Sequence, residues 1–250
     1  MARFVSIHSF RGGTGKSNLT ANLAAAIALE GRRVGIVDTD IQSPGIHVLF
    51  GLDEDNMGSA LNDYLWGRCT IEEAAHDVSA VLGEGPGAIF LVPSSIRAGE
   101  IARVLHEGYD AGTLTRGLES LSERLDLDVL LVDTHPGLNE ETLLSIVLSD
   151  VLVILLRPDR QDYQGTAVTV DVARQLEVPD LVLVVNKVPS SLDHEALRAR
   201  VESTYDAPVA GVFGLTEDMA DLASAGIFCL IEPDHPYSRE VRAVARRIQG

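Results

Sequence analysis

The sequence has few cysteines and no long apolar stretch. Cys69 and Cys229 stand alone, without a C-x-x-C pair, which argues against a disulfide framework or a metal–thiolate cluster. No apolar run reaches the roughly 18 uncharged residues that a membrane-spanning helix needs. The first apolar residues lead directly into a glycine-rich loop, which is not the layout of a signal peptide. We therefore expect a protein of the reducing cytoplasm.

Lysine is also scarce. The chain carries 20 basic and 37 acidic residues, a net charge of −17, which argues against a broad nucleic-acid-binding surface. Only Lys16 and Lys187 are lysine, and the other 18 basic residues are arginine. A general compositional bias toward arginine accounts for this scarcity. Both remaining lysines nevertheless fall within candidate nucleotide-binding motifs.

Length and hydrophobic patterning predict a single α/β domain over residues 1–250. Seven aliphatic runs are typical of strands buried on both faces, namely 4–7, 33–37, 89–92, 129–132, 151–156, 181–185 and 209–213. Helix-length segments alternate with them, at 18–30, 110–124, 139–149, 164–176, 192–203, 216–225 and 237–249. This alternation predicts a mainly parallel, twisted sheet of about seven or eight strands flanked by helices. Ligands of such sheets bind beyond the carboxyl ends of the strands.

A glycine-rich loop, SFRGGTGKS (9–17), follows the first expected strand. Glycines let successive backbone N–H groups turn toward a phosphate, and the N-terminus of the next helix adds its own free N–H groups. Lys16 can then reach the β- and γ-phosphate oxygens, and the Ser17 hydroxyl can bind Mg²⁺. The common pattern G-x-x-x-x-G-K-[ST] would place glycine at position 10, where this chain has Phe10. A plain glycine turn is the alternative interpretation.

Aspartates follow two further expected strands. Asp38 and Asp40, in DTDIQSPG (38–45), are separated by one residue and point to the same side of an extended chain. Asp133 follows four aliphatic residues in VLLVDTHPG (129–137). In such an arrangement the aspartate carboxylate contacts Mg²⁺ through a water molecule. A solvated acidic turn is the alternative for the first pair. We expect His135 to be a satisfied loop histidine rather than one tuned by Asp133, and no histidine spacing suggests zinc.

The segment RGGTGKS (11–17) resembles the K-G-G-x-G-K-[ST] loop of the MinD/ParA family of P-loop ATPases, with Arg11 in place of the first lysine. The resemblance continues through D-T-D, the D-T-x-P-G turn at 133–137 and VVNKVP (184–189), and so spans nearly the whole chain. It implies a P-loop NTPase fold. It also implies that Arg11 contacts the phosphates of a partner's ATP, a role that a guanidinium can fill through bidentate contacts.

The resemblance also assigns roles to the other motif residues. Asp40 would position the hydrolytic water, and the metal would be held by Ser17, Asp38 and Asp133. The residues after Asp40 depart from the family's P-Q-G-N. Catalysis would rest on Asp40, Lys16 and Arg11. The implied nucleotide contacts come from Arg11, Gly12, Gly13, Thr14, Gly15, Lys16, Ser17, Asn18 and Asn186.

The resemblance also bears on the choice of base. Asn186 would recognise the base, and Pro189 replaces the aspartate of the guanine-reading N-K-x-D pattern, which favours ATP over GTP. GVFGLTED (211–218) resembles the family's adenine-contacting strand end, with Gly214 where proline is usual. In RPDRQD (157–162), the two arginines would meet phosphate or a partner's acids, or would simply lie in a solvated loop.

The function that this resemblance implies is a slow, partner-stimulated Mg²⁺–ATPase that dimerises on ATP and acts as a spatial or regulatory switch. A nucleotide-sensing adaptor with negligible hydrolysis and a metalloenzyme-maturation ATPase are the alternatives. The partner or cargo is not identified by the sequence. The C-terminal segment 236–248 is weakly hydrophobic, so we expect it to pack on the domain, with weak or no membrane binding.

Overall fold

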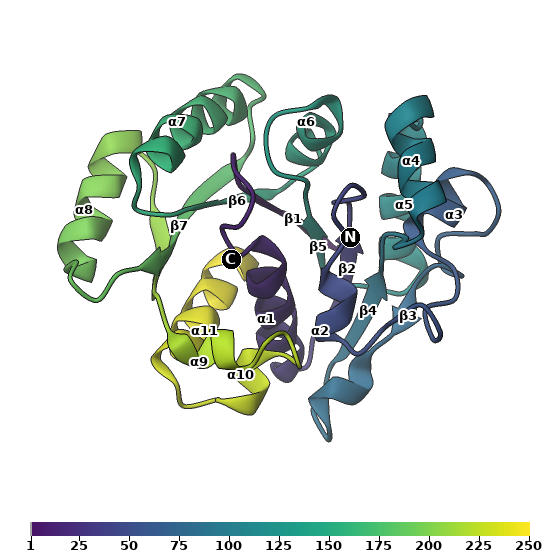
Figure 1. Ribbon diagram of the computed structural model, residues 1–250, viewed down its shortest axis with the longest axis horizontal. Coiled ribbons are helices and arrows are strands. Elements are labelled where there is room, and N and C mark those ends of the chain that lie inside the picture. Colours follow the sequence, from purple (N-terminus) through teal and green to yellow (C-terminus); the bar gives the residue numbers. More distant parts are fainter. Residues whose placement is uncertain (1) are drawn as a thin grey trace.

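An eight-stranded sheet forms the centre of the computed structural model, which describes residues 2–250 (Figure 1). Its strands are β1 (Arg3–His8), β2 (Arg33–Asp38), β3 (His76–Asp77), β4 (Ala88–Val92), β5 (Val129–Asp133), β6 (Val151–Leu156), β7 (Asp180–Val188) and β8 (Val209–Gly214). The spatial order is β3-β4-β2-β5-β1-β6-β7-β8, and every neighbouring pair is parallel except β3–β4. The seven predicted strands are confirmed, and the short β3 is the addition.

Helices cover both faces of the sheet (Figure 1). One face carries α1 (Lys16–Leu29), α2 (Ile46–Leu49), α10 (Phe228–Ile231) and α11 (Pro236–Gln249), with α9 (Glu217–Asp221) nearby. The other carries α3 (Leu61–Leu65), α4 (Ala98–Glu107) and α5 (Ala111–Arg124) over β2, β4 and β5, and α6 (Glu140–Val147), α7 (Arg160–Gln175) and α8 (His194–Tyr205) over β6–β8. A short 3₁₀ helix, η1 (Ser79–Leu82), precedes β4.

Burial explains why the strands are continuous aliphatic runs. All six residues of β6 are buried, because helices cover the sheet on both sides. Helix α1 is likewise buried on most sides, since it lies between the sheet and helices α10 and α11. The apolar face of α11, with Val241, Val244 and Ile248, is buried against the domain as predicted. Within residues 2–250, no helix is both long and apolar enough to cross a bilayer.

Some expected helix boundaries were wrong. Helix α7 begins at Arg160 rather than at 164, because the Asp159 side chain accepts hydrogen bonds from the backbone N–H groups of Gln161 and Asp162. Helix α9 ends at Asp221 rather than near 225, and α4 was not predicted at all. Only one residue of α4 is buried, so it leaves a weak hydrophobic signal in the sequence.

The burial of β6 yields a stability prediction. Replacing the fully buried Leu152 by alanine leaves a cavity beneath the helices and should lower the free energy of unfolding by about 2–5 kcal/mol. Leu105→Ala is the matched control, because that leucine is 58% exposed, and its effect should be within about 0.5 kcal/mol. Urea denaturation followed by circular dichroism measures both. Equal effects of the two substitutions would contradict the packing described here.

Candidate functional site

The motif residues converge at the carboxyl end of the parallel strands. The glycine-rich loop follows β1, whose neighbours in the sheet are β5 and β6. The backbone N–H of Gly137 donates to the Ser9 carbonyl at 3.0 Å, which ties the loop to the turn after β5. On the other side, the Asn186 amide donates to the Thr14 carbonyl at 2.8 Å. The structure thus brings the separate sequence motifs together at one site.

Two glycines give the loop its shape. Gly13 and Gly15 have φ angles of 77° and 100°, in the left-handed region that favours glycine. A β-carbon at Gly15 would also lie 2.7 Å from the Asn186 Nδ2 atom. Lys16 and Ser17 follow as the first residues of α1, so the free N–H groups of this helix face the same loop. This geometry suits a phosphate group.

Both residues of the Asn186–Lys187 pair brace the loop. Besides its bond to Thr14, Asn186 accepts a hydrogen bond from the backbone N–H of Lys187 at 2.9 Å. The Lys187 Nζ atom donates to the Gly13 carbonyl at 2.8 Å, although its backbone adopts a left-handed φ of 57°. The sequence assigned Asn186 to a base and gave Lys187 no contact. The Asn186 amide retains one N–H and one lone pair for that use.

Asp38 and Asp133 face each other in adjacent strands at the centre of the site. They are paired in the β2–β5 register, and at 0% and 1% exposure both are buried. The backbone N–H of Asp40 donates to one Asp38 oxygen at 2.9 Å. The other Asp38 oxygen and both Asp133 oxygens have no hydrogen-bond partner within residues 2–250. Burial raises the pKa of both carboxyls, while Lys16 and then the Ser17 hydroxyl lower the pKa of Asp133.

These orphaned oxygens fit a magnesium ion. Buried carboxylate oxygens without donors are costly unless a cation or proton meets them, and Mg²⁺ prefers oxygen ligands. No group of three His, Cys, Asp or Glu side chains that could hold a metal occurs in the described part of the chain. An ion here would therefore complete its shell with the Ser17 hydroxyl, phosphate oxygens and water, as Mg²⁺ commonly does. Asp38, Asp133 and Ser17 are the residues placed to hold it.

His135 contacts Asp40, which the sequence interpretation missed. The imidazole Nδ1 lies 2.7 Å from the Asp40 Oδ1 atom, and the two side chains are only 19% and 12% exposed. Asp40 follows β2 and His135 follows β5, and these strands are neighbours in the sheet. Their proximity could have been inferred from this strand order, but the sequence does not reveal the order.

A second histidine, His8, lies fully buried at the end of β1. Burial, and then the charges of Lys16 and His135, lower the pKa of His8 to about 3, so it is neutral. The Thr134 hydroxyl donates to the Ile7 carbonyl at 3.0 Å, so it accepts from the His8 Nδ1 atom, 2.8 Å away. A neutral imidazole beside Lys16 avoids repulsion between two buried cations. The sequence gave no signal for this residue beyond its place before the loop.

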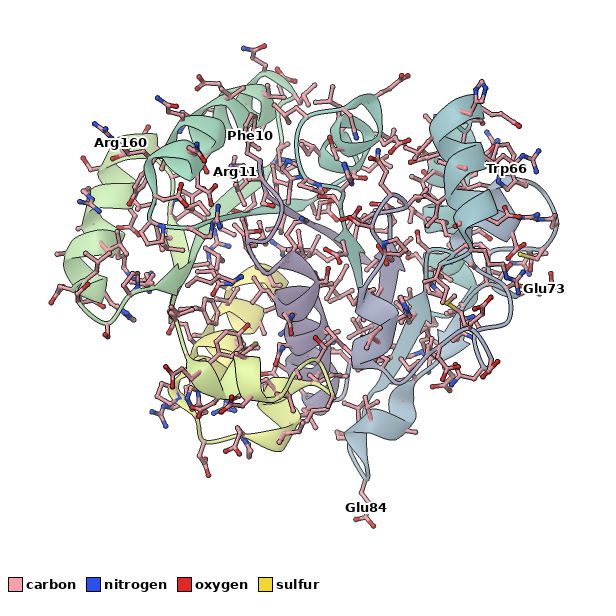
Figure 2. The ribbon with its side chains drawn as sticks, viewed as in Figure 1. Phe10, Arg11, Trp66, Glu73, Glu84 and Arg160 are labelled. Atoms are coloured by element: carbon pink, nitrogen blue, oxygen red, sulfur yellow. The ribbon has the colours of Figure 1, made fainter. Side chains whose placement is uncertain are left out.

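Phe10 and Arg11 lie against helix α7 (Figure 2). A β-carbon at Gly165 would lie 2.1 Å from the Phe10 ring, so the ring occupies the space left by a missing side chain. Next to it, the Arg11 guanidinium donates to the Gln161 side chain and lies 3.8 Å from the Asp162 carboxylate. Arg11 is 40% exposed and contacts its own chain here.

Arg157 is bound to Asp162 in the first turn of α7. Its Nε and Nη2 atoms donate to the two oxygens of Asp162 at 2.9 and 3.3 Å, and its backbone N–H donates to the same carboxylate. This bidentate pair holds the turn after β6 in place. Arg160, by contrast, is exposed and makes no ion pair within residues 2–250 (Figure 2). Of the two arginines considered for phosphate, Arg157 is thus a structural residue of this turn.

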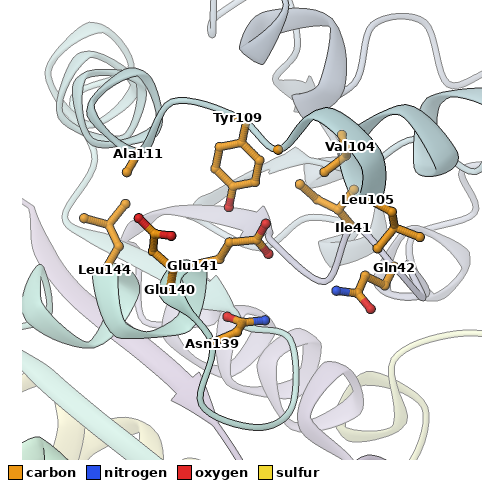
Figure 3. Close-up of a pocket in the computed structure, with 11 residues that line it drawn as sticks. Ile41, Gln42, Val104, Leu105, Tyr109, Ala111, Asn139, Glu140, Glu141 and Leu144 are labelled. Atoms are coloured by element: carbon orange, nitrogen blue, oxygen red, sulfur yellow. The ribbon is translucent and has the colours of Figure 1, made fainter.

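Two cavities lie at the carboxyl end of the sheet, and one of them adjoins the phosphate loop. The first, of about 230 Å³, lies between Gly15 and Asn18 of the loop, the Asn186–Lys187 pair and the segment 214–220. Its position beside Asn186 suits a nucleotide base, and it includes the segment after β8 that the sequence singled out. The second, of about 310 Å³, lies between α4–α5 and the start of α6, where Tyr109 points toward Glu141 (Figure 3).

Comparison with known proteins agrees with this geometry. A family model described as an AAA domain matches residues 2–178. An uncharacterized ATP-binding protein of Methanocaldococcus jannaschii is 26% identical over 251 residues, covering all of this chain and 89% of that protein. The antiactivator FleN of Pseudomonas aeruginosa is 32% identical over 136 residues, which are 54% of this chain and 44% of FleN.

A solved structure gives the same fold. The septum site-determining protein MinD of Pyrococcus horikoshii, in complex with Mg-ADP, superposes with a TM-score of 0.79 at 19% identity. The superposition covers 99% of this chain and 96% of that chain. The chain therefore has the fold of MinD.

The brace formed by Lys187 yields a binding prediction. Lys187→Met removes the hydrogen bond to Gly13 and loosens the loop, which should weaken nucleotide binding about two- to tenfold, as expected for a loss of about 0.5–1.5 kcal/mol. Lys187→Arg keeps a cation and the same β-carbon at this left-handed residue, so it should bind nearly as well as the wild type. Titration with a fluorescent ATP analogue measures both. Equal affinity of the two variants would mean that the brace does not matter.

Proposed function

Because the chain belongs to the AAA domain family and has the fold of the MinD/ParA ATPases, we propose that it is a Mg²⁺-dependent ATPase that dimerises on ATP. The observation that carries this proposal is the pair of buried aspartates with unpartnered oxygens beside Lys16 and the glycine loop. Hydrolysis would be slow and stimulated by a partner, and the dimer would separate afterwards. The cycle would act as a spatial or regulatory switch in the cytoplasm.

The chemistry would be an in-line attack of water on the γ-phosphate. Lys16 and the loop N–H groups lie where they can stabilise charge on the phosphate oxygens in the transition state. Mg²⁺, when bound, neutralises phosphate charge and would be held by Ser17, Asp38 and Asp133. Asp40, at the rim of the same site, would orient the attacking water.

Dimerisation would require Arg11 to exchange its contacts. In the single chain it contacts Gln161 and Asp162, and it would turn to the phosphates of the partner's ATP. A partly exposed ion pair contributes about 0–1 kcal/mol, less than a charge-assisted bond to phosphate. The Asp162 carboxylate also keeps its three hydrogen bonds from Arg157 when Arg11 leaves. Release of Arg11 therefore leaves no buried charge unpaired.

A protein partner is the expected recipient of the signal. The similarity to FleN, an antiactivator, supports a regulatory output through another protein. The net charge of −17 makes a broad nucleic-acid surface a poor alternative. The partner would recognise the surface that the ATP-bound dimer creates.

The exchange of Arg11 can be tested by substitution. Arg11→Ala should bind ATP at close to wild-type affinity but fail to dimerise, because the contact across the interface is lost. Arg124→Ala, which removes an exposed arginine from helix α5, is the control and should dimerise normally. Light scattering with Mg²⁺–ATP reports the mass of each. ATP-dependent dimerisation of Arg11→Ala at the wild-type concentration range would refute the role in trans.

Hydrolysis itself is tested by single-turnover phosphate release. The wild type should release phosphate, whereas Asp40→Ala should release it at least about tenfold more slowly and accumulate as the ATP-bound dimer, because the water is no longer oriented. Asp55→Ala removes an exposed aspartate and should behave as the wild type. Absence of phosphate release from the wild type would instead favour a nucleotide-sensing adaptor.

A further inference from the structure

The Asp40 carboxylate is held on one side only. Its Oδ1 atom accepts hydrogen bonds from the His135 Nδ1 atom at 2.7 Å, from the Ser43 backbone N–H at 3.2 Å and from the Ser43 hydroxyl at 3.1 Å. No side chain or backbone group within residues 2–250 donates to its Oδ2 atom. The carboxylate is thus fixed through one oxygen while the other remains available.

We propose that His135 is a positioning residue, which holds Asp40 through Oδ1 so that Oδ2 orients the attacking water. This inference rests on the proposed ATPase function and adds a residue that the family motif does not specify, since His135 occupies the variable position of the turn 133–137. An ionised Asp40 can only accept, so His135 donates through an Nδ1–H group. The bond links the turn after β5 to the turn after β2.

The surroundings of His135 favour this donor role. Asp40 lies within hydrogen-bond distance of the imidazole, and Glu141 is also nearby: burial raises the pKa of the half-buried Glu141, and the charge of His135 lowers it. Glu141 belongs to the first turn of α6 and faces the cavity shown in Figure 3. Other charged or titratable groups near this cluster are Asp38, Asp133, Lys16, His8 and Glu140. The 2.7 Å separation between the imidazole Nδ1 and the Asp40 Oδ1 atom suits an N–H donor facing a carboxylate.

The expected effect follows from orientation. Without His135, only the two longer hydrogen bonds from Ser43 hold Oδ1, so the Asp40 side chain samples more orientations and presents an oxygen to the water in only some of them. Loss of catalytic orientation slows the chemical step while ground-state binding is unchanged. The effect should therefore fall on kcat, with little change in KM.

Two substitutions separate hydrogen bonding from shape. Asparagine can place an amide N–H close to the position of the imidazole Nδ1, whereas leucine fills the volume without a donor. His135→Leu should lower kcat about tenfold with KM for ATP and the affinity for a fluorescent ATP analogue unchanged within twofold. His135→Asn should restore kcat to within about threefold of the wild type. His106→Leu, an exposed histidine of α4, is the control and should have no effect.

A double substitution tests whether His135 acts through Asp40. In the Asp40→Ala background, His135→Leu should not slow the residual single-turnover rate further, because the group that it positions is absent. An unchanged or faster His135→Leu, equal losses for the asparagine and leucine variants, or an additive loss in the double variant would each overturn the proposal. Wild type assayed in parallel separates this from the proposed function, which fails if the wild type itself releases no phosphate.

Discussion

The site is organised by the cost of burying two facing carboxylates. Asp38 and Asp133 lie opposite each other in β2 and β5, removed from solvent, with three of their four oxygens unpartnered. Loss of water raises the pKa of both carboxyls, and the charge of Asp133 raises the pKa of Asp38 further. Lys16 is the nearby cation that opposes this effect at Asp133. A divalent ion would compensate the remaining negative charge and use the free lone pairs of these oxygens. The two carboxylates and the phosphate loop would therefore bind the ion and the phosphate together.

The three cations around the glycine loop have separate tasks. Lys16 is buried beside the acids, Lys187 holds the Gly13 carbonyl from outside, and Arg11 lies on helix α7. The first two are the only lysines of the chain. In both places the ammonium is a compact charge on a flexible stem, whereas the contact of Arg11 with an amide and a carboxylate suits a planar guanidinium. In a chain whose other basic residues are arginine, both lysines thus lie at the glycine loop.

Much of the architecture follows from local sequence patterns, and the side-chain network does not. All seven aliphatic runs are strands, because burial on both faces requires continuous apolar sequence. The position of the glycine loop, Asp38 and Asp133 also follows, since strand ends in parallel sheets converge. The start of α7 was mispredicted because it depends on the side-chain cap formed by Asp159. Helix α4 was missed because it has too few buried residues to produce a helical repeat of apolar residues in the sequence. The contact of His135 with Asp40 depends on strand order, which a single sequence does not contain.

The packing of the Phe10 ring against Gly165 of helix α7 has an evolutionary consequence. The ring occupies the space of the side chain that Gly165 lacks, so these two positions, 155 residues apart, cannot vary independently. A lineage that acquires any side chain at 165 must first give up the aromatic ring at 10, and glycine at 10, as in the common phosphate loop, removes the restriction on the helix. We therefore expect the two positions to covary among relatives, which would distinguish the branch of the family that carries this pairing.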